Sequence, residues 1–342
     1  MSGPVVAIVG ATGAVGREML AVLGQRAFPL GRIRVFASER SVGSRLPSRW
    51  GELVVEPLHE GSLRGTDLAL FSAGSAIARR LGPAAAADGA LVIDNSSAFR
   101  MDPGVPLVVP EVNPEALAPR RGAGARGGLI ANPNCSTIIM VVAVTPLRRA
   151  FGVERIVVST YQAVSGAGAQ GIRELEEQAR AWAHDGPAPA PSVFHEPCAF
   201  NLFSHNSAVD LETGLNLEER KMIDETRKIW GDASARISAT CVRVPVRRAH
   251  SESINVTLAR PASEADVRAA LRAAPGLEIV DDRAGNRFPT PLKADGRDSI
   301  LVGRLRRDPS QPDGRGYDLF VSGDQLRKGA ALNAVQIAEH LF

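Results

Sequence analysis

The first third of the chain alternates short apolar runs with helical segments. The β-branched run at residues 5–9 is apolar throughout, which predicts a strand buried on both faces of a parallel sheet. Further strands are predicted at residues 32–36, 67–71 and 90–94, with a first helix at 17–25. A loop follows each strand, and loops at the carboxyl ends of parallel strands are where such sheets bind ligands. The pattern predicts a doubly wound α/β domain.

The pattern of apolar and polar residues changes after residue 135. Longer runs, several with apolar and polar residues in alternation, predict a mixed or antiparallel sheet in an α+β second domain. These strands are predicted within residues 155–164, 237–246, 253–259, 300–307 and 317–323. Helices are predicted at residues 171–184, 217–229 and 264–273, with a Pro-rich connector at 184–194. A long amphipathic helix at residues 328–341 is expected to return to the first domain.

Length and composition indicate a two-domain globular protein and argue against a nucleic-acid-binding or membrane protein. A chain of 342 residues exceeds what one core usually serves, so two domains are expected. The 40 basic and 37 acidic residues are spread along the chain, which argues against a nucleic-acid-binding surface. No apolar run reaches the roughly 20 residues of a membrane span, and the N-terminus lacks the features of a signal peptide. The Gly- and Arg-rich segment 119–128 is predicted to be an exposed, mobile loop. We therefore expect a cytoplasmic protein with no membrane partner.

Three cysteines differ in their surroundings. Cys135, Cys198 and Cys241 form no C-x-x-C pair, so neither a disulfide framework nor a zinc site is expected, and no metal is predicted. Cys135 lies in "LIANPNCSTIIM", where Pro133 favours an extended chain and the apolar run 138–147 suits a buried helix. A cysteine at a helix start has its thiolate stabilised by the dipole and by free N–H groups. The alternative is a small buried core residue.

The segment "GATGAVG" follows the first strand directly. Glycines allow a tight strand-to-helix turn, and the helix N-terminus then faces a pyrophosphate. The residues predicted to line this turn are Gly10, Thr12, Gly13, Ala14 and Val15. After the second strand, the hydroxyls of Ser38 and Ser41 and the guanidinium of Arg40 suit a 2′-phosphate, which favours NADP. Glu39 leaves NAD as the alternative.

Several charged residues could bind a small anionic substrate. Arg100 follows a strand end, and Asn134 neighbours Cys135. Glu218 and Lys221 share a helix face, and their spacing alone favours a surface ion pair. Arg243 alternates with valines and is expected to point away from the face that those valines bury. His250 follows seven residues later, either as a surface residue or as a catalyst.

Taken together, these pieces closely resemble the aspartate-β-semialdehyde dehydrogenase family. The resemblance covers nearly the whole chain, and the matching segments occur in the family's order. They are "GATGAVG", "DNSSAFR", "PEVNPEAL", "NPNCSTI", "YQAVSGAGAQG", "EERKM", "RVPVRRAHSESINV" and "GDQLRKGAALNAVQIAE". The segment "NPNCSTI", the segment "QAVSGAG" and the spacing from arginine to histidine are far more specific than the glycine turn.

The resemblance implies a role for each matched residue. Cys135 is the nucleophile that forms a thioester, Gln162 orients the intermediate, and His250 is the acid/base catalyst, working near neutral pH without a large pKa shift. Arg243 binds the substrate α-carboxylate and Glu218 its ammonium group, while Arg100, Asn134 and Lys221 bind phosphate. The predicted cofactor set also includes Ser72, Gly74, Asn95, Ser165, Gly166, Gln325 and Asn333.

The resemblance also implies an architecture and a reaction. An NADP-binding domain of the Rossmann type, residues 1–133 with the helix at 325–342, is joined to a catalytic and dimerisation domain at 134–324 with a mixed sheet, as in glyceraldehyde-3-phosphate dehydrogenase. The reaction is reduction of aspartyl-β-phosphate to the semialdehyde with release of phosphate, in the aspartate pathway to lysine, threonine, methionine and isoleucine. A homodimer is expected, with a tetramer as the alternative.

Two other functions compete with this one. N-acetyl-γ-glutamyl-phosphate reductase shares the acyl-phosphate chemistry, but its cysteine loop resembles His-Pro-Gly-Cys. A non-catalytic NADP-binding paralogue would not need the set of Cys135, Gln162, Arg243 and His250.

Overall fold

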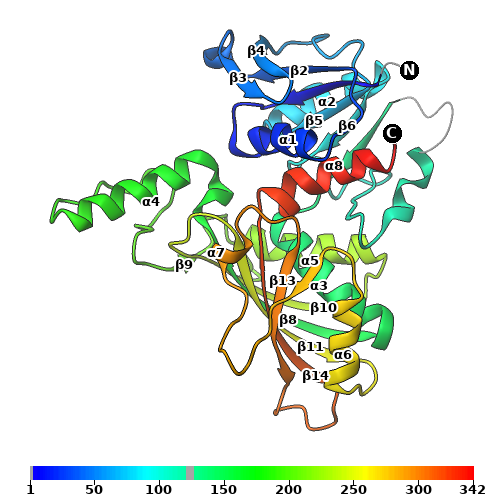
Figure 1. The fold of residues 1–342 in the computed structure, drawn as a ribbon, viewed down its shortest axis with the longest axis vertical. Coiled ribbons are helices and arrows are strands. Elements are labelled where there is room, and N and C mark those ends of the chain that lie inside the picture. Colours follow the sequence, from blue (N-terminus) through cyan, green and yellow to red (C-terminus); the bar gives the residue numbers. More distant parts are fainter. Residues whose placement is uncertain (1–2, 121–126) are drawn as a thin grey trace. The chain divides into compact units, whose positions relative to one another are not determined.

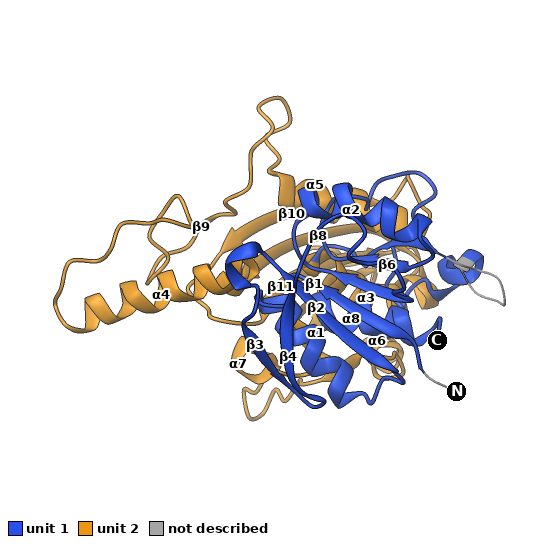
Figure 2. Ribbon diagram, turned by 90° about the horizontal axis from the view of Figure 1, so that it is seen from above, with its two compact units in different colours: residues 1–134, 329–342 blue, residues 135–328 orange. Residues whose placement is uncertain are grey.

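The chain folds into two units, each built around its own seven-stranded sheet (Figures 1 and 2). The computed structural model describes residues 3–120 and 127–342. Unit 1 comprises residues 1–134 and 329–342, and unit 2 comprises residues 135–328. The central part of the loop predicted at 119–128, residues 121–126, lies outside the described residues.

The sheet of unit 1 has the strand order β3-β4-β2-β1-β5-β6-β7. Every neighbouring pair is parallel except β3 and β4, which form an antiparallel edge. If the edge strand β3 is left out and the other six strands are renumbered along the chain, their order in the sheet is 3-2-1-4-5-6. This is the Rossmann order, and its switch point lies between β1 and β5. The strands are β1 (Val5–Val9), β2 (Arg32–Ala37), β3 (Arg45–Ser48), β4 (Gly51–Pro57), β5 (Leu68–Phe71), β6 (Leu91–Asp94) and β7 (Gly128–Ala131).

Alternate residues of β1 serve two different cores. Val6 and Ile8 pack with apolar residues of α1 (Ala14–Gln25) and α8 (Leu332–Glu339). Ala7 and Val9 pack with α2 (Ser75–Ala87) on the other face. Residues of α8 are buried in the first core, so this C-terminal helix is part of unit 1. The turn before α8 is a π-helix, Arg327–Ala331.

The sheet of unit 2 is mixed, as predicted, with the order β12-β13-β14-β11-β8-β10-β9. The pairs β10–β8 and β12–β13 are parallel, and the others are antiparallel. Its helices α3, α5 and α6 contact the sheet, whereas α4 projects away from it (Figure 1). The strands are β8 (Val153–Gln162), β9 (Phe203–Ser204), β10 (Arg236–Arg243), β11 (His250–Leu258), β12 (Leu277–Ile279), β13 (Ile300–Arg307) and β14 (Gly316–Gly323). The helices are α3 (Cys135–Phe151), α4 (Gly168–Ala183), α5 (Leu217–Trp230), α6 (Glu264–Arg272) and α7 (Pro291–Ala294).

Some elements differ from the prediction. The hairpin β3–β4 and the short elements β9, β12 and α7 were not predicted from the pattern. In β4 most side chains are exposed or only half-buried, so the strand has little apolar pattern. It also contains residue types that are uncommon in strands, namely Gly51, Glu52, Glu56 and Pro57. Helix α1 begins at Ala14 rather than residue 17, because Gly13 is already its extended N-cap.

Two glycines of the first turn allow the close approach of strand and helix. Gly10 has a φ of +90°, which favours glycine, and a Cβ there would lie 2.8 Å from the carbonyl carbon of Ser72. A Cβ on Gly16 would meet the carbonyl oxygen of Gly10 and would lie 2.7 Å from Cα of Ala11. Backbone atoms cannot rotate away, so these two positions require glycine.

We predict that Gly16→Ala lowers the free energy of unfolding by about 1–3 kcal/mol, the usual cost of overpacking. The control is Gly82→Ala within α2, where the new methyl group would find ordinary 3.4 Å contacts with Leu129 and Phe99 and no loss is expected. Urea unfolding of both variants measures the difference. Equal stability of the two variants would contradict the packing argument.

Candidate active site

Cys135 is the first residue of α3, a helix of 17 residues whose first turns are fully buried. Its side chain is half-buried, whereas Cys198 and Cys241 are buried. Burial raises the pKa of Cys198 to about 11 and raises that of Cys241 further, so both remain thiols. Only Cys135 combines partial exposure with the N–H groups of a helix start, which favour a thiolate.

His250, the first residue of β11, lies beside this cysteine. Its Nε2 is 3.4 Å from Sγ of Cys135, and its Nδ1 accepts a hydrogen bond of 3.0 Å from the backbone N–H of Ala163. The ring is fully buried. Burial, together with the positive charge of Arg243, lowers the pKa of His250 to about 3. The expectation of a histidine that titrates near neutral pH without a large shift is therefore wrong.

Gln162, Glu218 and Lys221 form a connected polar group. Gln162 ends β8, and its amide donates to Oε1 of Glu218 at 3.3 Å. Lys221 Nζ donates to Oε2 of Glu218 at 3.0 Å. Glu218 is in the first turn of α5, where Asn216 forms a capping box. The ion pair exists, but its carboxylate is only 5% exposed, which contradicts a solvated surface pair.

Arg243, the last residue of β10, is a buried cation with a side chain turned to the interior. This contradicts the expectation that the neighbouring valines occupy the buried face, since Val242 is the more exposed of the two. Burial lowers the pKa of the guanidinium below its ordinary value, although the negative charge of Glu218 opposes this. Nη1 donates to the carbonyl oxygen of Ala163 at 2.8 Å. Within the described residues, Arg243 forms no ion pair with a carboxylate.

Two further partners of Arg243 were not predicted from the sequence. Nη2 of Arg243 lies 2.9 Å from Nε2 of His205 and 3.1 Å from Oδ1 of Asn206. Both residues lie in the irregular segment between β9 and α5, which carries no periodicity that could have pointed to them. The short pairing of β9 with β10 brings them to the site, together with a hydrogen bond of 2.9 Å from the N–H of His205 to the carbonyl oxygen of Cys241.

The remaining predicted residues of unit 2 surround His250 closely. Oε1 of Gln325 accepts a hydrogen bond of 2.8 Å from the N–H of Ala249, and its amide donates to Oγ of Ser165. A Cβ on Gly166 would lie 3.0 Å from Nη1 of Arg243 and 3.4 Å from Cε1 of His250. Gly166 therefore leaves room beside the side chains of both Arg243 and His250.

In unit 1, the predicted residues gather at the carboxyl ends of the strands. Ser72 Oγ donates to the carbonyl oxygen of Val9 at 3.2 Å, and Asn95 Nδ2 donates to that of Phe71 at 3.2 Å. Arg100 is buried and donates to the carbonyl oxygens of Asn132 and Asn95. Gly74 has a φ of +84° at the N-cap of α2.

Three predicted residues follow β2, and another lies in the interior. Ser38 and Arg40 are exposed and Ser41 is half-buried, around a 3-10 turn at Glu39–Ser41. Asn333 is fully buried and donates to the carbonyl oxygen of Val108 and to Oδ1 of Asn132. A direct cofactor contact of Asn333 stays a prediction.

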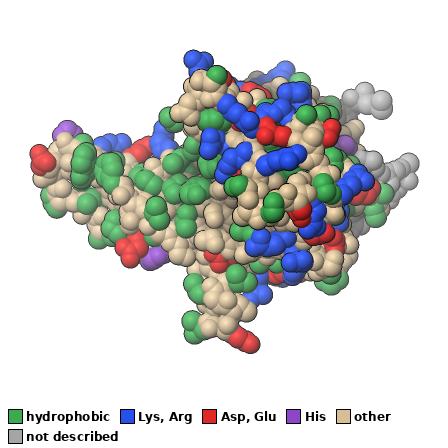
Figure 3. All heavy atoms as spheres, turned by 90° about the horizontal axis from the view of Figure 1, so that it is seen from below, with side chains coloured by type: hydrophobic (Ala, Val, Ile, Leu, Met, Phe, Trp, Pro, Cys, Tyr) green, Lys and Arg blue, Asp and Glu red, His purple; other side chains and the backbone are tan. Residues whose placement is uncertain are grey.

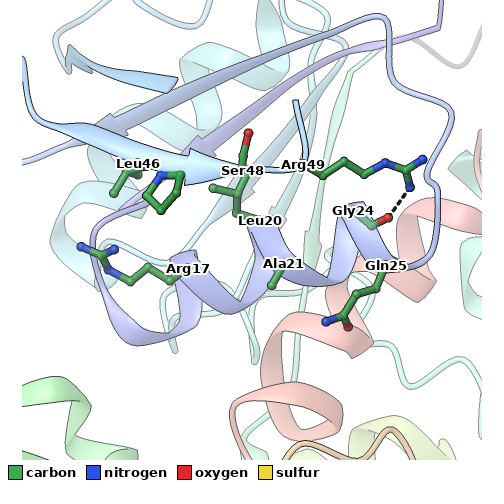
Figure 4. Close-up of a pocket in the computed structure, with 9 residues that line it drawn as sticks. Arg17, Leu20, Ala21, Gly24, Gln25, Leu46, Ser48 and Arg49 are labelled. Carbon is green, nitrogen blue, oxygen red and sulfur yellow. Dashed lines mark hydrogen bonds between the residues drawn. The ribbon is translucent and has the colours of Figure 1, made fainter. Parts of the chain in front are cut away.

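The glycine turn fits a dinucleotide. Gly13 is the N-cap of α1, no side chain caps this helix, and Thr12, Ala14 and Val15 flank the turn. The backbone N–H groups of the first turn can therefore receive a phosphate. A hollow of about 630 Å³ lies between α1 and β3 (Figure 4). Its lining includes Leu20 and Leu46, and it contains none of the predicted site residues.

Neither a metal centre nor a membrane segment is apparent in the part of the chain that the structure describes. Within residues 3–120 and 127–342, no group of three or more His, Cys, Asp or Glu side chains could hold a metal ion. The described helices are all too short or too polar to cross a membrane.

The sequence matches known protein families and known proteins over most of its length. Residues 5–119 match the family model "semialdehyde dehydrogenase, NAD binding domain", and residues 144–328 match "semialdehyde dehydrogenase, dimerisation domain". Aspartate-semialdehyde dehydrogenase of Synechocystis is 48% identical over 100% of this chain and 98% of its own. That of Aquifex aeolicus is 49% identical over 98% and 97% of the two chains.

Solved structures extend the likeness to the fold. Aspartate semialdehyde dehydrogenase II of Vibrio cholerae, complexed with ASA, has a TM-score of 0.93 at 43% identity and covers 99% of this chain and 98% of that one. The Candida albicans enzyme with NADP has a TM-score of 0.77 at 25% identity, covering 99% and 98%. The chain therefore belongs to the aspartate-semialdehyde dehydrogenase family.

Proposed function

We propose that the protein interconverts aspartyl-β-phosphate and aspartate-β-semialdehyde through a thioester on Cys135, with NADP(H) as cofactor. The observation that carries this proposal is the distance of 3.4 Å between Sγ of Cys135 and Nε2 of the buried His250, beside Arg243, a buried cation whose hydrogen-bond partners are neutral. In the reductive direction the thiolate attacks the acyl phosphate, the C–O bond to phosphate breaks, and a thioester remains. NADPH, when bound, would supply the hydride that reduces this thioester, and the thiolate of Cys135 leaves as the semialdehyde forms.

His250 acts as a hydrogen-bond donor toward sulfur and toward the developing oxyanion. Because the N–H of Ala163 donates to Nδ1, that nitrogen carries the lone pair, and in the neutral ring the proton is on Nε2. Nε2 faces Sγ of Cys135. This proton and the N–H groups at the start of α3 stabilise negative charge on sulfur and oxygen.

Each charged group of the substrate is assigned to different residues of the site. Arg243 binds the α-carboxylate, since it is a buried cation whose partners are all neutral. Glu218 binds the α-ammonium group, next to Gln162. Arg100, Asn134 and Lys221 bind phosphate, and Lys221 is about one-third exposed, so its ammonium group has donors left after the contact with Glu218.

The two units have separate tasks in this proposal. Unit 1 binds NADP, with Ser38, Arg40 and Ser41 toward the 2′-phosphate, because Arg40 is exposed at the end of β2. Ser165, Gly166 and Gln325 of unit 2 complete the cofactor site. We place the enzyme in the cytoplasm, consistent with the three cysteines, which form no disulfide in the described part of the chain.

Unit 2 also forms a homodimer through the open face of its sheet. Alternate residues of the central strands, including Ser159, Tyr161, Ser253 and Phe320, are exposed or half-buried on the face away from α3. Tyr161 and Phe320 lie with ring centroids 6.1 Å apart on this face. Apolar side chains also gather along α4 and its following segment (Figure 3), where Trp182 and Phe200 are both 67% exposed.

Activity tests the central proposal. We expect reduction of NADP, followed at 340 nm, when the protein receives aspartate-β-semialdehyde and phosphate together, and a much lower rate with NAD. Cys135→Ala should abolish the reaction while the protein still folds, because the nucleophile is lost. Phosphate-independent turnover, or turnover that persists in the variant, would contradict the thioester mechanism.

The buried, neutral His250 predicts a pH dependence of stability. Because its pKa in the folded protein lies below its ordinary value, its contribution to stability is present above pH 6.5 and is lost as the pH falls toward 3. Between pH 7 and pH 5 this group should lower the free energy of unfolding by about 2 kcal/mol. His250→Gln should remove this part of the pH dependence, as measured by urea unfolding at both pH values. An unchanged pH slope in the variant would count against a neutral His250.

The dimer interface is tested at the centre of the open face. Ser253 is exposed on β11 between β8 and β14, so Ser253→Arg places a charge where two sheets would meet. We expect this variant to sediment as a monomer, because a buried unpaired charge is costly. The control Ala265→Arg, on the exposed side of α6, should remain dimeric. A dimeric Ser253→Arg protein would place the interface elsewhere.

A further inference from the structure

The segment between β9 and α5 organises the charged side of the site. In β9, Phe203 pairs with Arg243 and Ser204 with Val242, so the chain passes Arg243 just before residues 205 and 206. The same segment then positions Glu218, whose N–H donates to Oγ of Ser207 at 3.2 Å and to Oδ1 of Asn216 at 3.0 Å. This one irregular segment therefore positions both Arg243 and Glu218, the residues assigned to the carboxylate and the ammonium group of the substrate.

The acceptors that surround the guanidinium of Arg243 are neutral. They are the carbonyl oxygen of Ala163 at 2.8 Å, Nε2 of His205 at 2.9 Å and Oδ1 of Asn206 at 3.1 Å. The Nε atom of Arg243 is buried and has no hydrogen-bond partner among the described residues. Since a buried N–H normally has a partner, this donor is left for a ligand that accepts hydrogen bonds.

The position of His205 prevents it from becoming a cation. Its Nδ1 faces the backbone N–H of Ser207 at 3.2 Å, and its Nε2 faces the guanidinium of Arg243. A protonated ring would direct an N–H at a donor on both sides. A neutral ring has a single lone pair and can accept from only one of these two donors. We assign the lone pair to Nε2, because the guanidinium is closer and charged and is therefore a stronger donor than the N–H of Ser207.

We propose that His205 is a positioning residue for substrate binding, which orients Arg243 through a neutral acceptor and so leaves its charge available to the substrate carboxylate. The inference rests on the proposed function, in which Arg243 binds that carboxylate. Asn206 provides the second neutral acceptor. Consistent with this role, burial lowers the pKa of His205 to about 4, with Arg243 and Lys221 also disfavouring its charged form and Glu218 opposing them.

A carboxylate in place of either side chain would put a negative charge next to the guanidinium of Arg243. It would form an ion pair with Arg243 before the substrate arrives, and the substrate carboxylate would then have to displace it. Glutamine and glutamate are nearly identical in shape, so the pair His205→Gln and His205→Glu separates charge from packing. Asn206→Asp repeats the test at an exposed position, where the substitution is expected to fold.

The experiment is steady-state kinetics with aspartate-β-semialdehyde, phosphate and NADP. For His205→Glu and Asn206→Asp we expect KM for the semialdehyde to rise about 10- to 100-fold, the equivalent of one charge-assisted contact, with kcat changed much less. His205→Gln should restore KM to near the wild-type value. Ser204→Glu is the control for added charge, because Ser204 is exposed and pairs with Val242 of β10 rather than with Arg243.

The kinetic results distinguish the inference about His205 from the proposed function. If the wild-type protein turns over and the glutamine and glutamate variants share one KM, with Asn206→Asp also unchanged, the inference about His205 is overturned while the proposed function stands. If the wild-type protein shows no turnover of the semialdehyde, the proposed function fails and the inference fails with it. A rise in KM confined to the acidic variants at 205 and 206 supports the inference.

Discussion

The register of three neighbouring strands assembles the site in unit 2. Strands β8 and β10 are parallel and end together, with Gln162 opposite Arg243. Strand β11 runs antiparallel to β8 and begins at that same edge with His250. A shift of one residue in any of these strands would turn its functional side chain to the opposite face of the sheet. The buried helix α3 then presents Cys135 to His250.

The interior of this sheet holds ionisable groups in unusual states of charge. His250 is kept neutral, and two residues further along β11, Glu252 is fully buried, with neither carboxyl oxygen hydrogen-bonded to any of the described residues. Burial raises the pKa of Glu252 well above its ordinary value, so it is neutral as well. Arg243 is the group that retains its charge, because a guanidinium does not lose its proton in a protein. An anion that enters such a site finds a cation whose field is weakly screened.

Local signals in the sequence predicted a large part of this architecture. The strands of the Rossmann sheet and the helix start at Cys135 depend on neighbouring residues, so apolar runs and the Asn-Pro-Asn segment were sufficient. The orientation of Arg243 was predicted wrongly, because alternation alone does not say which face of a strand is covered. The low pKa of His250 and the contacts of His205 arise from burial between distant segments. The edge hairpin β3–β4 was missed, since an exposed edge has little apolar pattern.

The discontinuity of unit 1 has a consequence for how the chain folds. Its core includes Leu332, Val335 and Ile337 of α8, packed with β1 and α1 from the other end of the sequence. During synthesis, the residues of unit 2 leave the ribosome before α8 does, so unit 2 has its complete sequence first. Unit 1, although most of it is encoded first, keeps part of its apolar surface uncovered until α8 has been made. This reverses the usual order in which N-terminal domains mature before those that follow.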